Sequence, residues 1–148
     1  MSDAAPAKGR AAGVDFGTVR IGVAVSDFDR TIASPLENYT RRGEEQDARW
    51  FRQLVEREEI ALFVVGLPLH MDGRESEKSA EARQFGEWLA AATGVPVEFF
   101  DERLSSHEAE RLMLDAEMTK KRRKKRLDML AAQIILSGYL ESTEKFSE

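Results

Sequence analysis

Four acidic residues lie at the ends of short apolar segments that are far apart in the sequence. Asp15 ends one apolar run, and Asp101 with Glu102 ends another. Asp128 stands at the start of an apolar stripe with helical spacing. Burying an unpaired carboxylate costs several kcal/mol unless it is paired or holds a metal. Carboxylates that converge therefore need cations, and their hard oxygens suit Mg²⁺ or Mn²⁺.

Two such ions about 3.5 to 4 Å apart can activate a water molecule and stabilise the leaving oxygen in phosphodiester hydrolysis. Each acid also has a structural explanation. Asp15 can cap a turn through its own backbone, and Asp128 favours the positive end of a helix dipole. Asp101 or Glu102 can pair with Arg103 on the surface at almost no net energy. Nuclease chemistry requires the acids to meet, so we turn to the elements that carry them.

The start of the chain predicts a three-stranded antiparallel meander. Two apolar runs at 11–15 and 21–26 are separated by a tight polar segment containing Gly17, which is typical of a β-hairpin. A third, poorer strand is expected at 31–33, with Pro35 consistent with a sheet edge.

The rest of the chain alternates between helical and strand periodicity. In chain order we expect a helix at 44–58, a strand at 60–65, a helix at 76–93, a strand at 95–100, a helix from 105 and a last helix at 127–140. A meander followed by strand-helix-strand crossovers gives an α/β fold, with a mixed sheet and helices on its faces. Sites in such sheets collect at the carboxyl ends of neighbouring strands, which is where Asp15, Asp101 and Glu102 are expected.

Composition sets the class of protein. A chain of 148 residues is enough for one domain, expected at 11–141 between a disordered tail at 1–10 and a C-terminal tail at 142–148. The absence of cysteine excludes disulfides and thiolate metal sites. No apolar run approaches the roughly 20 residues that cross a bilayer, so we expect no membrane partner and a cytoplasmic location.

The net charge of −5 argues against bulk electrostatic coating of nucleic acid. One segment has the opposite sign, and such runs are often only a solvated face. Just before Asp128, it can also bind phosphates, with Arg20 and Arg103 extending the path. The run is Lys120, Lys121, Arg122, Arg123, Lys124, Lys125 and Arg126.

Four motifs together resemble the YqgF/RuvX family. They are V-D-F-G-T-x-R-I-G-V-A-V-S-D at 14–27, V-V-G-L-P-L-x-M-D-G at 64–73, D-E-R-L-S at 101–105 and L-D-x-x-A-A-x-x-I-L-x-x-Y-L at 127–140. Members of this family are described as pre-16S rRNA nucleases and as Holliday junction resolvases. The resemblance implies a ribonuclease H-like fold with a mixed five-stranded sheet and helices on both faces.

The resemblance also implies a set of catalytic acids. The family's first-strand Asp falls on Asp15, its last-helix Asp on Asp128, and its middle acid on Asp101 or Glu102. We choose Glu102 as the catalytic acid, because strand alternation puts Asp101 on the apolar face and related resolvases carry a Glu at this strand end. All four acids remain candidate ligands of Mg²⁺ or Mn²⁺. The long basic run departs from the family pattern, so its role is inferred from its charge alone.

The main functional prediction is a metal-dependent endonuclease on structured RNA, by resemblance the 5′ end of pre-16S rRNA. The alternative in the same class is a resolvase of branched DNA, for which a homodimer would supply two active sites. A different class is a non-catalytic nucleic-acid- or nucleotide-binding module, since D-x-G-T also resembles the phosphate loop of actin-like and sugar kinases. Length argues against a kinase-like clamp, which needs two such domains.

Overall fold

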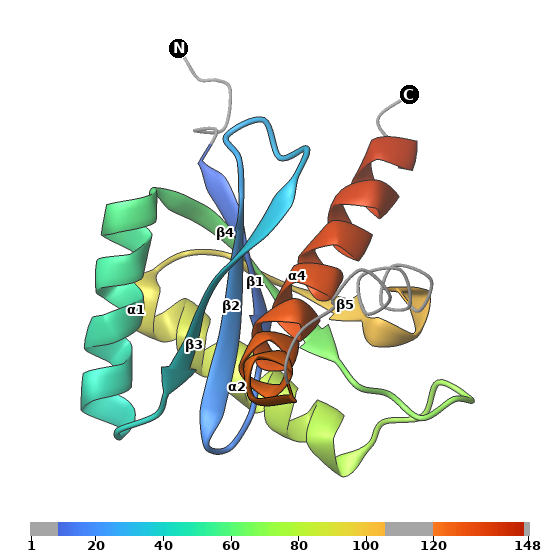
Figure 1. Cartoon of the computed structure of the whole chain (residues 1–148), viewed down its shortest axis with the longest axis horizontal. Coiled ribbons are helices and arrows are strands. Elements are labelled where there is room, and N and C mark those ends of the chain that lie inside the picture. Colours follow the sequence, from blue (N-terminus) through green and yellow to red (C-terminus); the bar gives the residue numbers. More distant parts are fainter. Residues whose placement is uncertain (1–8, 106–119, 147–148) are drawn as a thin grey trace.

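The computed structural model describes residues 9–105 and 120–146, which form a five-stranded mixed sheet between two layers of helices (Figure 1). The strands lie in the order β3-β2-β1-β4-β5. They are β1 (Arg10–Asp15), β2 (Arg20–Ser26), β3 (Ala33–Thr40), β4 (Ile60–Leu67) and β5 (Val97–Asp101). The described helices are α1 (Glu44–Glu58), α2 (Glu77–Thr93), the short 3₁₀ helix η1 (Glu102–Ser105) and α4 (Lys120–Phe146).

The sheet topology is the expected one. β1 pairs antiparallel with β2 and β2 with β3, which is the predicted meander, whereas β1 pairs parallel with β4 and β4 with β5. Residues 11–14 of β1 are fully buried because helices cover both faces of the central strands. Because β1, β4 and β5 run parallel, their carboxyl ends meet at the same end of the sheet.

Two hydrophobic clusters occupy the two faces. On one face α1 and α2 bury Phe51, Leu54, Phe85 and Leu89 against the sheet. On the other face, within the described part of the chain, the helix that packs on the sheet is α4, through the residues Ala132, Ile135, Leu136 and Leu140. The opposite positions of α1 and α4 about the sheet are visible in Figure 1.

Helix α4 lies unusually close to the sheet because the strands present glycine to it. A Cβ atom at Gly13 would lie 2.7 Å from the carbonyl oxygen of Ala132, and one at Gly66 would lie 2.5 Å from Cδ1 of Ile135. Both distances are shorter than van der Waals contact, so a larger residue at either position would push the helix outward. These contacts fix α4 over the face that Gly13 and Gly66 share.

The predicted helix at 76–93 is confirmed, and the structure shows what ends it on each side. Ser76 caps α2 by accepting a hydrogen bond from the Ser79 backbone at 2.9 Å, while the Ser79 hydroxyl accepts one from the Ser76 backbone at 2.7 Å. Gly94 ends the helix with a φ of 74° and donates its N–H to Ala90 at 2.8 Å. The Ser76 end of α2 follows the loop that leaves β4.

Two predicted boundaries are wrong. The third strand is not a short run at 31–33 but an eight-residue edge strand that continues past Pro35, which a free edge tolerates. The last helix begins at Lys120 and not at 127, because lysine and arginine are good helix formers even where the apolar stripe stops. The helix expected from 105 lies outside the described residues, apart from Ser105. None of the described helices combines the length and apolar character needed to cross a membrane.

Candidate active site

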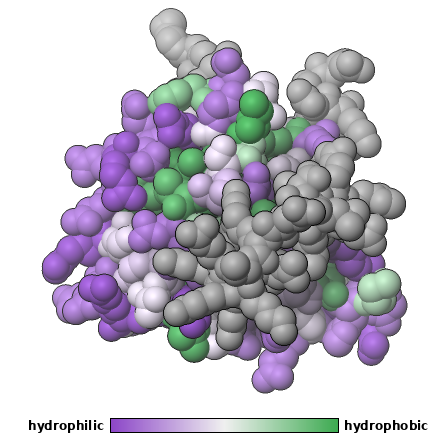
Figure 2. Space-filling model, in the orientation of Figure 1, coloured by the Kyte–Doolittle hydropathy of each residue, from purple (hydrophilic) through white to green (hydrophobic). Residues whose placement is uncertain are grey.

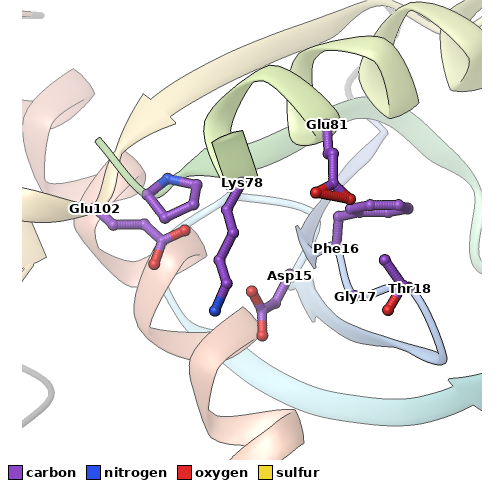
Figure 3. A pocket seen from close by; sticks show the side chains of 8 residues that line it. Asp15, Phe16, Gly17, Thr18, Lys78, Glu81 and Glu102 are labelled. Carbon is purple, nitrogen blue, oxygen red and sulfur yellow. The ribbon is translucent and has the colours of Figure 1, made fainter. Parts of the chain in front are cut away.

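The structure brings Asp15 and Glu102 into one pocket of about 420 Å³ (Figure 3). Asp15 is the last residue of β1, and Glu102 directly follows the end of β5. Because β1 and β5 flank β4 and all three run parallel, both carboxylates come to the same sheet edge. The pocket is lined by Asp15, Phe16, Gly17, Thr18, Pro68, Lys78, Glu81 and Glu102.

Glu102 shares with α4 the face of the sheet on which Gly66 lies. Its Oε2 atom lies 2.8 Å from the position that a Cβ at Gly66 would occupy, next to Ile135. Glycine at this position therefore leaves the space that the carboxylate fills. Asp15 follows Ala11 and Gly13 in strand alternation, and these residues also face α4. The two acids thus approach each other across the end of β4.

The pocket disfavours the ionised form of Glu102. The pKa of Glu102 is raised to about 7, first by burial and then by the negative charges of Asp15 and Asp101. A strongly perturbed carboxylate in a cleft is typical of functional sites. A cation bound beside Glu102 would stabilise its charged form.

Asp101 has a different environment, although it is adjacent in sequence. Arg103 donates to it from Nε at 3.0 and 2.9 Å and from its backbone N–H at 3.0 Å. These bonds lower the pKa of Asp101 despite some burial. Strand alternation places Asp101 with Val97 and Phe99, which pack toward the cluster under α1 and α2. The choice of Glu102 over Asp101 as the catalytic acid stays a prediction, and the two carboxylates differ in their surroundings.

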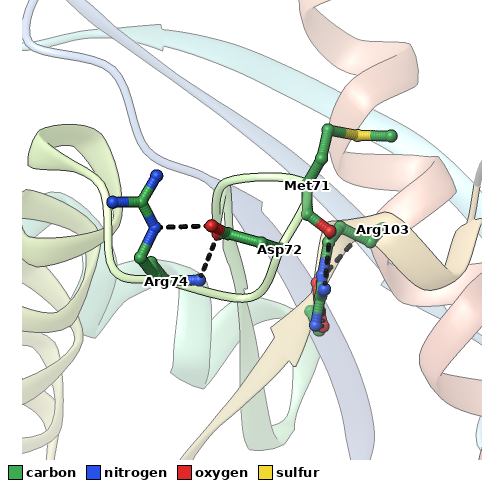
Figure 4. A network of polar contacts seen from close by, with 5 residues as sticks. Met71, Asp72, Arg74 and Arg103 are labelled. Atoms are coloured by element: carbon green, nitrogen blue, oxygen red, sulfur yellow. Dashed lines mark hydrogen bonds and ion pairs between the residues drawn. The ribbon is translucent and has the colours of Figure 1, made fainter.

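Arg103 also uses its two terminal nitrogens within the protein, and Nη2 donates to Asp101 at 2.5 Å. Its Nη1 donates to the carbonyl oxygen of Met71 at 3.1 Å, so it ties the end of β5 to the loop after β4 (Figure 4). Within that loop Asp72 accepts from the Arg74 backbone at 3.0 Å. This network shapes the loop that carries Pro68, one wall of the pocket.

The remaining predicted site residues are Asp128, the basic run and Arg20, and the structure describes only some of their side chains. The backbone of Asp128 belongs to α4, one turn before Ala132, but its side chain lies outside the described residues, as do the side chains of the basic run at 120–126. Figure 1 shows the amino-terminal end of α4 toward the β1–β2 hairpin. Arg20 is exposed at the start of β2, paired in register with Thr40.

Sequence reasoning missed the contribution of α2 to the pocket. Lys78 and Glu81 line it from the first turns of this helix, and the Lys78 side chain points toward the carboxylates of Asp15 and Glu102 (Figure 3). The position of these residues at a helix start directly after a strand-end loop is the sequence feature that could have identified them. Among the described side chains, to which that of Asp128 does not belong, no group of three acidic or histidine residues could hold a metal ion.

Solved structures with the same arrangement define the class of fold. RuvC of Thermus thermophilus, solved in complex with a Holliday junction substrate, matches with a TM-score of 0.60 over 92% of this chain and 96% of that one, at 14% identity. The yeast mitochondrial Holliday junction resolvase Ydc2 matches with a TM-score of 0.53 over 93% and 80% of the two chains, at 12% identity. The fold is therefore ribonuclease H-like, as predicted.

Sequence relatives define the family more narrowly. A protein of Rhodopirellula baltica named "Putative pre-16S rRNA nuclease" is 48% identical over 140 residues, which cover 95% of this chain and 81% of that protein. A protein of the same name from Rhodobacter capsulatus is 44% identical over 138 residues, covering 93% and 87% of the two chains. The family model RuvX, described as Holliday junction resolvase, matches residues 9–142. This chain belongs to that family.

Proposed function

We propose that this protein is a metal-dependent endonuclease that hydrolyses phosphodiester bonds in structured nucleic acid. The observation that carries the proposal is the shared pocket of Asp15 and Glu102, in which burial and the charge of Asp15 raise the pKa of Glu102. Two acids that oppose each other's ionisation, at the end of strands in a ribonuclease H-like sheet, form a site that favours cations.

The residues present fit Mg²⁺ or Mn²⁺, because carboxylate oxygens are the ligands that these hard cations prefer. Asp15 and Glu102 would hold the ions from the sheet, and Asp128 would complete the set from α4, with Asp101 beside them. When bound, the ions activate a water molecule and stabilise the charge that develops on the scissile phosphate.

The protein's own residues position the substrate. Lys78 places an ammonium group in the pocket, where it would contact a nonbridging phosphate oxygen of a bound strand. Gly17 and Thr18 line the pocket from the β1–β2 loop beside Asp15, and their small side chains leave room for the sugar-phosphate backbone. Hydrolysis then forms a bond from the water oxygen to phosphorus and breaks the bond to the leaving sugar oxygen, which takes up a proton.

The substrate that the relatives favour is RNA. Relatives at 48 and 44% identity carry the name "Putative pre-16S rRNA nuclease", whereas the resolvases are similar at 12 to 14% identity and show only a common fold. We therefore place this protein in 5′-end processing of pre-16S rRNA during ribosome biogenesis in the cytoplasm. Resolution of Holliday junctions by a homodimer is the second candidate, favoured by the description of the family model.

The basic run completes this proposal as a tether for phosphates. Lys120 to Arg126 form the first turns of α4, ahead of Asp128 on the same helix. Replacing four of these residues with alanine should weaken nucleic-acid binding and flatten its dependence on salt, because each lost phosphate contact reduces counterion release. Binding that keeps its affinity and its salt slope would remove the tether.

The central test is cleavage by wild type and by Asp15→Asn of matched RNA and four-way-junction DNA, with Mn²⁺ and with chelator. Asp15→Asn keeps the shape of the side chain and removes its charge, so it should fold normally and lose divalent-dependent cleavage. Asp29→Asn, in the exposed turn after β2 and so at the opposite end of that strand from the partner of Asp15, makes the same change of charge away from the site and serves as the control. Cleavage that survives Asp15→Asn would place the chemistry elsewhere.

A further inference from the structure

A second pocket, which we call the β3 pocket, lies where the free edge of the sheet meets α1. It has a volume of about 490 Å³, within the range of ligand sites. Figure 1 shows β3 passing beside α1, and Figure 2 shows hydrophilic side chains over this side of the molecule. The pocket is lined by Glu37, Asn38, Tyr39, Thr40, Arg42, Gln46, Arg49, Trp50 and Gln53.

The aromatic wall of the β3 pocket is held rigidly. The rings of Tyr39 and Trp50 are stacked with centroids 4.3 Å apart and an angle of 21° between their planes. Phe51 supports the indole edge-on at 4.9 Å. The Tyr39 hydroxyl donates to the buried carboxylate of Asp47 at 2.6 Å, which fixes the phenol ring. Trp50 is only partly buried, so it forms a preorganised platform at the pocket wall.

The rim of the pocket is cationic and rich in amides. Arg42 and Arg49 are exposed, and within the described part of the chain neither guanidinium has an ion-pair partner. Gln46 and Gln53 lie one turn on either side of Arg49 and Trp50 along α1. Amide groups both donate and accept hydrogen bonds, as the edges of nucleobases do, and guanidinium groups match phosphate. Stacking on an aromatic ring with arginine nearby is how unpaired nucleotides are bound.

The β3 pocket lies at the same end of the sheet as the candidate active site. Asp15 pairs in register with Gly22, and Gly22 pairs with Asn38, so Asn38 is two strands from Asp15. At the usual strand spacing their Cα atoms are about 10 Å apart. That distance spans only a short stretch of one nucleic-acid strand.

Arg41 joins the two pockets directly. Its guanidinium lies over the ring of Phe16, 5.2 Å from the centroid, and Phe16 lines the active-site pocket. On its other side Arg41 donates to Asp47 at 3.4 Å, next to the aromatic wall. Its backbone N–H also donates to the Val19 carbonyl in the β1–β2 loop at 2.9 Å. The surface between the pockets is therefore braced by one residue.

We propose that the β3 pocket binds an unpaired nucleotide of the substrate strand that flanks the bond to be cut. The base stacks on Trp50 between the glutamine amides, and Arg42 and Arg49 contact the adjoining phosphates. This inference rests on the proposed nuclease function for its reading of the neighbouring site, and it adds a preference for a single-stranded flank. A second copy of the chain is a less suitable occupant, because Pro35 and the irregular register near Val23 interrupt β3 as a pairing edge.

The test uses the two tryptophans of the chain. In a Trp88→Phe background, Trp50 is the sole indole, and its fluorescence should be quenched on titration with a six-nucleotide single-stranded RNA in chelator. A blunt duplex of the same length should not quench it. Trp50→Leu should weaken binding of a labelled hexamer, followed by anisotropy, about tenfold.

A charge-matched pair of variants keeps the test independent of folding. Arg42→Gln with Arg49→Gln should lower the salt slope of hexamer binding by about 1.4, the value for two single-strand phosphate contacts. Arg52→Gln with Arg57→Gln removes the same charge from α1 away from the pocket, since Arg52 contacts the Ala92 carbonyl and Arg57 contacts Glu58. Only the first pair should change binding.

The outcomes separate this inference from the proposed function. If the hexamer fails to quench Trp50, or both arginine pairs behave alike, the β3 pocket is not a nucleotide site, whatever the cleavage assay shows. Quenching that depends on protein concentration without RNA, together with a dimer in sedimentation, would overturn the inference in favour of self-association. If the hexamer quenches Trp50 but wild type cuts no substrate, the pocket stands and the nuclease proposal falls.

Discussion

Two carboxylates of this protein, those of Asp47 and Glu102, have pKa values that their surroundings shift in opposite directions. Asp47 in α1 is fully buried, and it accepts hydrogen bonds from the Tyr39 hydroxyl at 2.6 Å and the Arg42 backbone at 2.9 Å. Burial alone would raise its pKa, but these bonds outweigh burial and lower it. Glu102 is half-buried beside Asp15, and its pKa is raised to about 7.

The difference distinguishes an acid that supports the fold from an acid that supports a site. Donors around Asp47 stabilise its charged form, so the carboxylate holds β3 and α1 together. At Glu102, burial and the negative charges of Asp15 and Asp101 destabilise the charged form, which a bound cation would stabilise. Burial by itself therefore does not identify a functional acid; the sign of the neighbouring charges does.

The sharpest test of this contrast uses the adjacent residues Glu102 and Asp101. Glu102→Gln should reduce Mn²⁺-dependent cleavage about 10³-fold or more, because it removes a metal-binding charge from the site. Asp101→Asn should reduce cleavage less than about tenfold, because the Asp101 carboxylate is held by hydrogen bonds from Arg103. The measurement is kcat/KM on one RNA substrate. Equal losses in the two variants would mean that both acids bind the ion.

Removing Asp47 should chiefly destabilise the fold. Asp47→Ala leaves the Tyr39 hydroxyl and the Arg42 N–H without their acceptor in a buried place, which should lower the free energy of unfolding by about 3 kcal/mol. Tyr39→Phe removes one donor only and should cost about 1 kcal/mol. Urea unfolding measures both. A change below that of Tyr39→Phe would show that the Asp47 network contributes little.

Glu102 should instead lower stability as the pH rises. Its pKa is about 7 in the folded chain and has an ordinary value of 4.5, so the folded state binds the proton more tightly. Stability from this group is complete below pH 4.5, falls between pH 4.5 and 7, and is lost above. At pH 8, Glu102→Gln should be more stable than wild type by about 1 to 2 kcal/mol, reduced for partial exposure.

Thermal unfolding of wild type and Glu102→Gln at two pH values measures this difference and includes its own control. At pH 4 the wild type and Glu102→Gln should unfold at the same temperature, because Glu102 is then neutral in both states. Mn²⁺ at pH 8 should raise the Tm of wild type more than that of Glu102→Gln, since the ion binds the folded site through this carboxylate. A variant that is less stable than wild type at pH 8 would contradict the raised pKa.

The sequence predicted those elements in which apolar residues recur with a clear helical or strand period. The hairpin, both crossover helices and the parallel strands follow from apolar periodicity, and the family motifs placed Asp15 and Glu102 at strand ends. The sequence could not show that β3 extends past Pro35, because edge strands tolerate residues that central strands exclude. It also gave no reason to separate Asp47 from the other acids of α1, since only the folded chain brings Tyr39 to it.

The residues of α2 that line the pocket could not be predicted from the sequence for a similar reason. Lys78 and Glu81 look like ordinary exposed helix charges in the sequence, and their position over the site depends on where the loop after β4 delivers the helix. That loop is fixed by contacts between distant residues, among them the bond from Arg103 to the Met71 carbonyl. Local pattern predicts which elements form, whereas such long-range contacts decide which side chains meet.

The smallest expected effect concerns Arg103, which sequence reasoning offered as a phosphate contact. Its nitrogens donate to Asp101 and Met71, so its charge is already matched within the protein (Figure 4). Arg103→Gln should leave the salt slope of nucleic-acid binding in chelator unchanged and shift the Tm by less than about 3 °C, as expected for an exposed ion pair. A slope reduced by about 0.7 to 0.9 would instead count one lost phosphate contact. In that event Arg103 would exchange Asp101 for the substrate, and the two neighbouring acids would be less different than their resting geometry indicates.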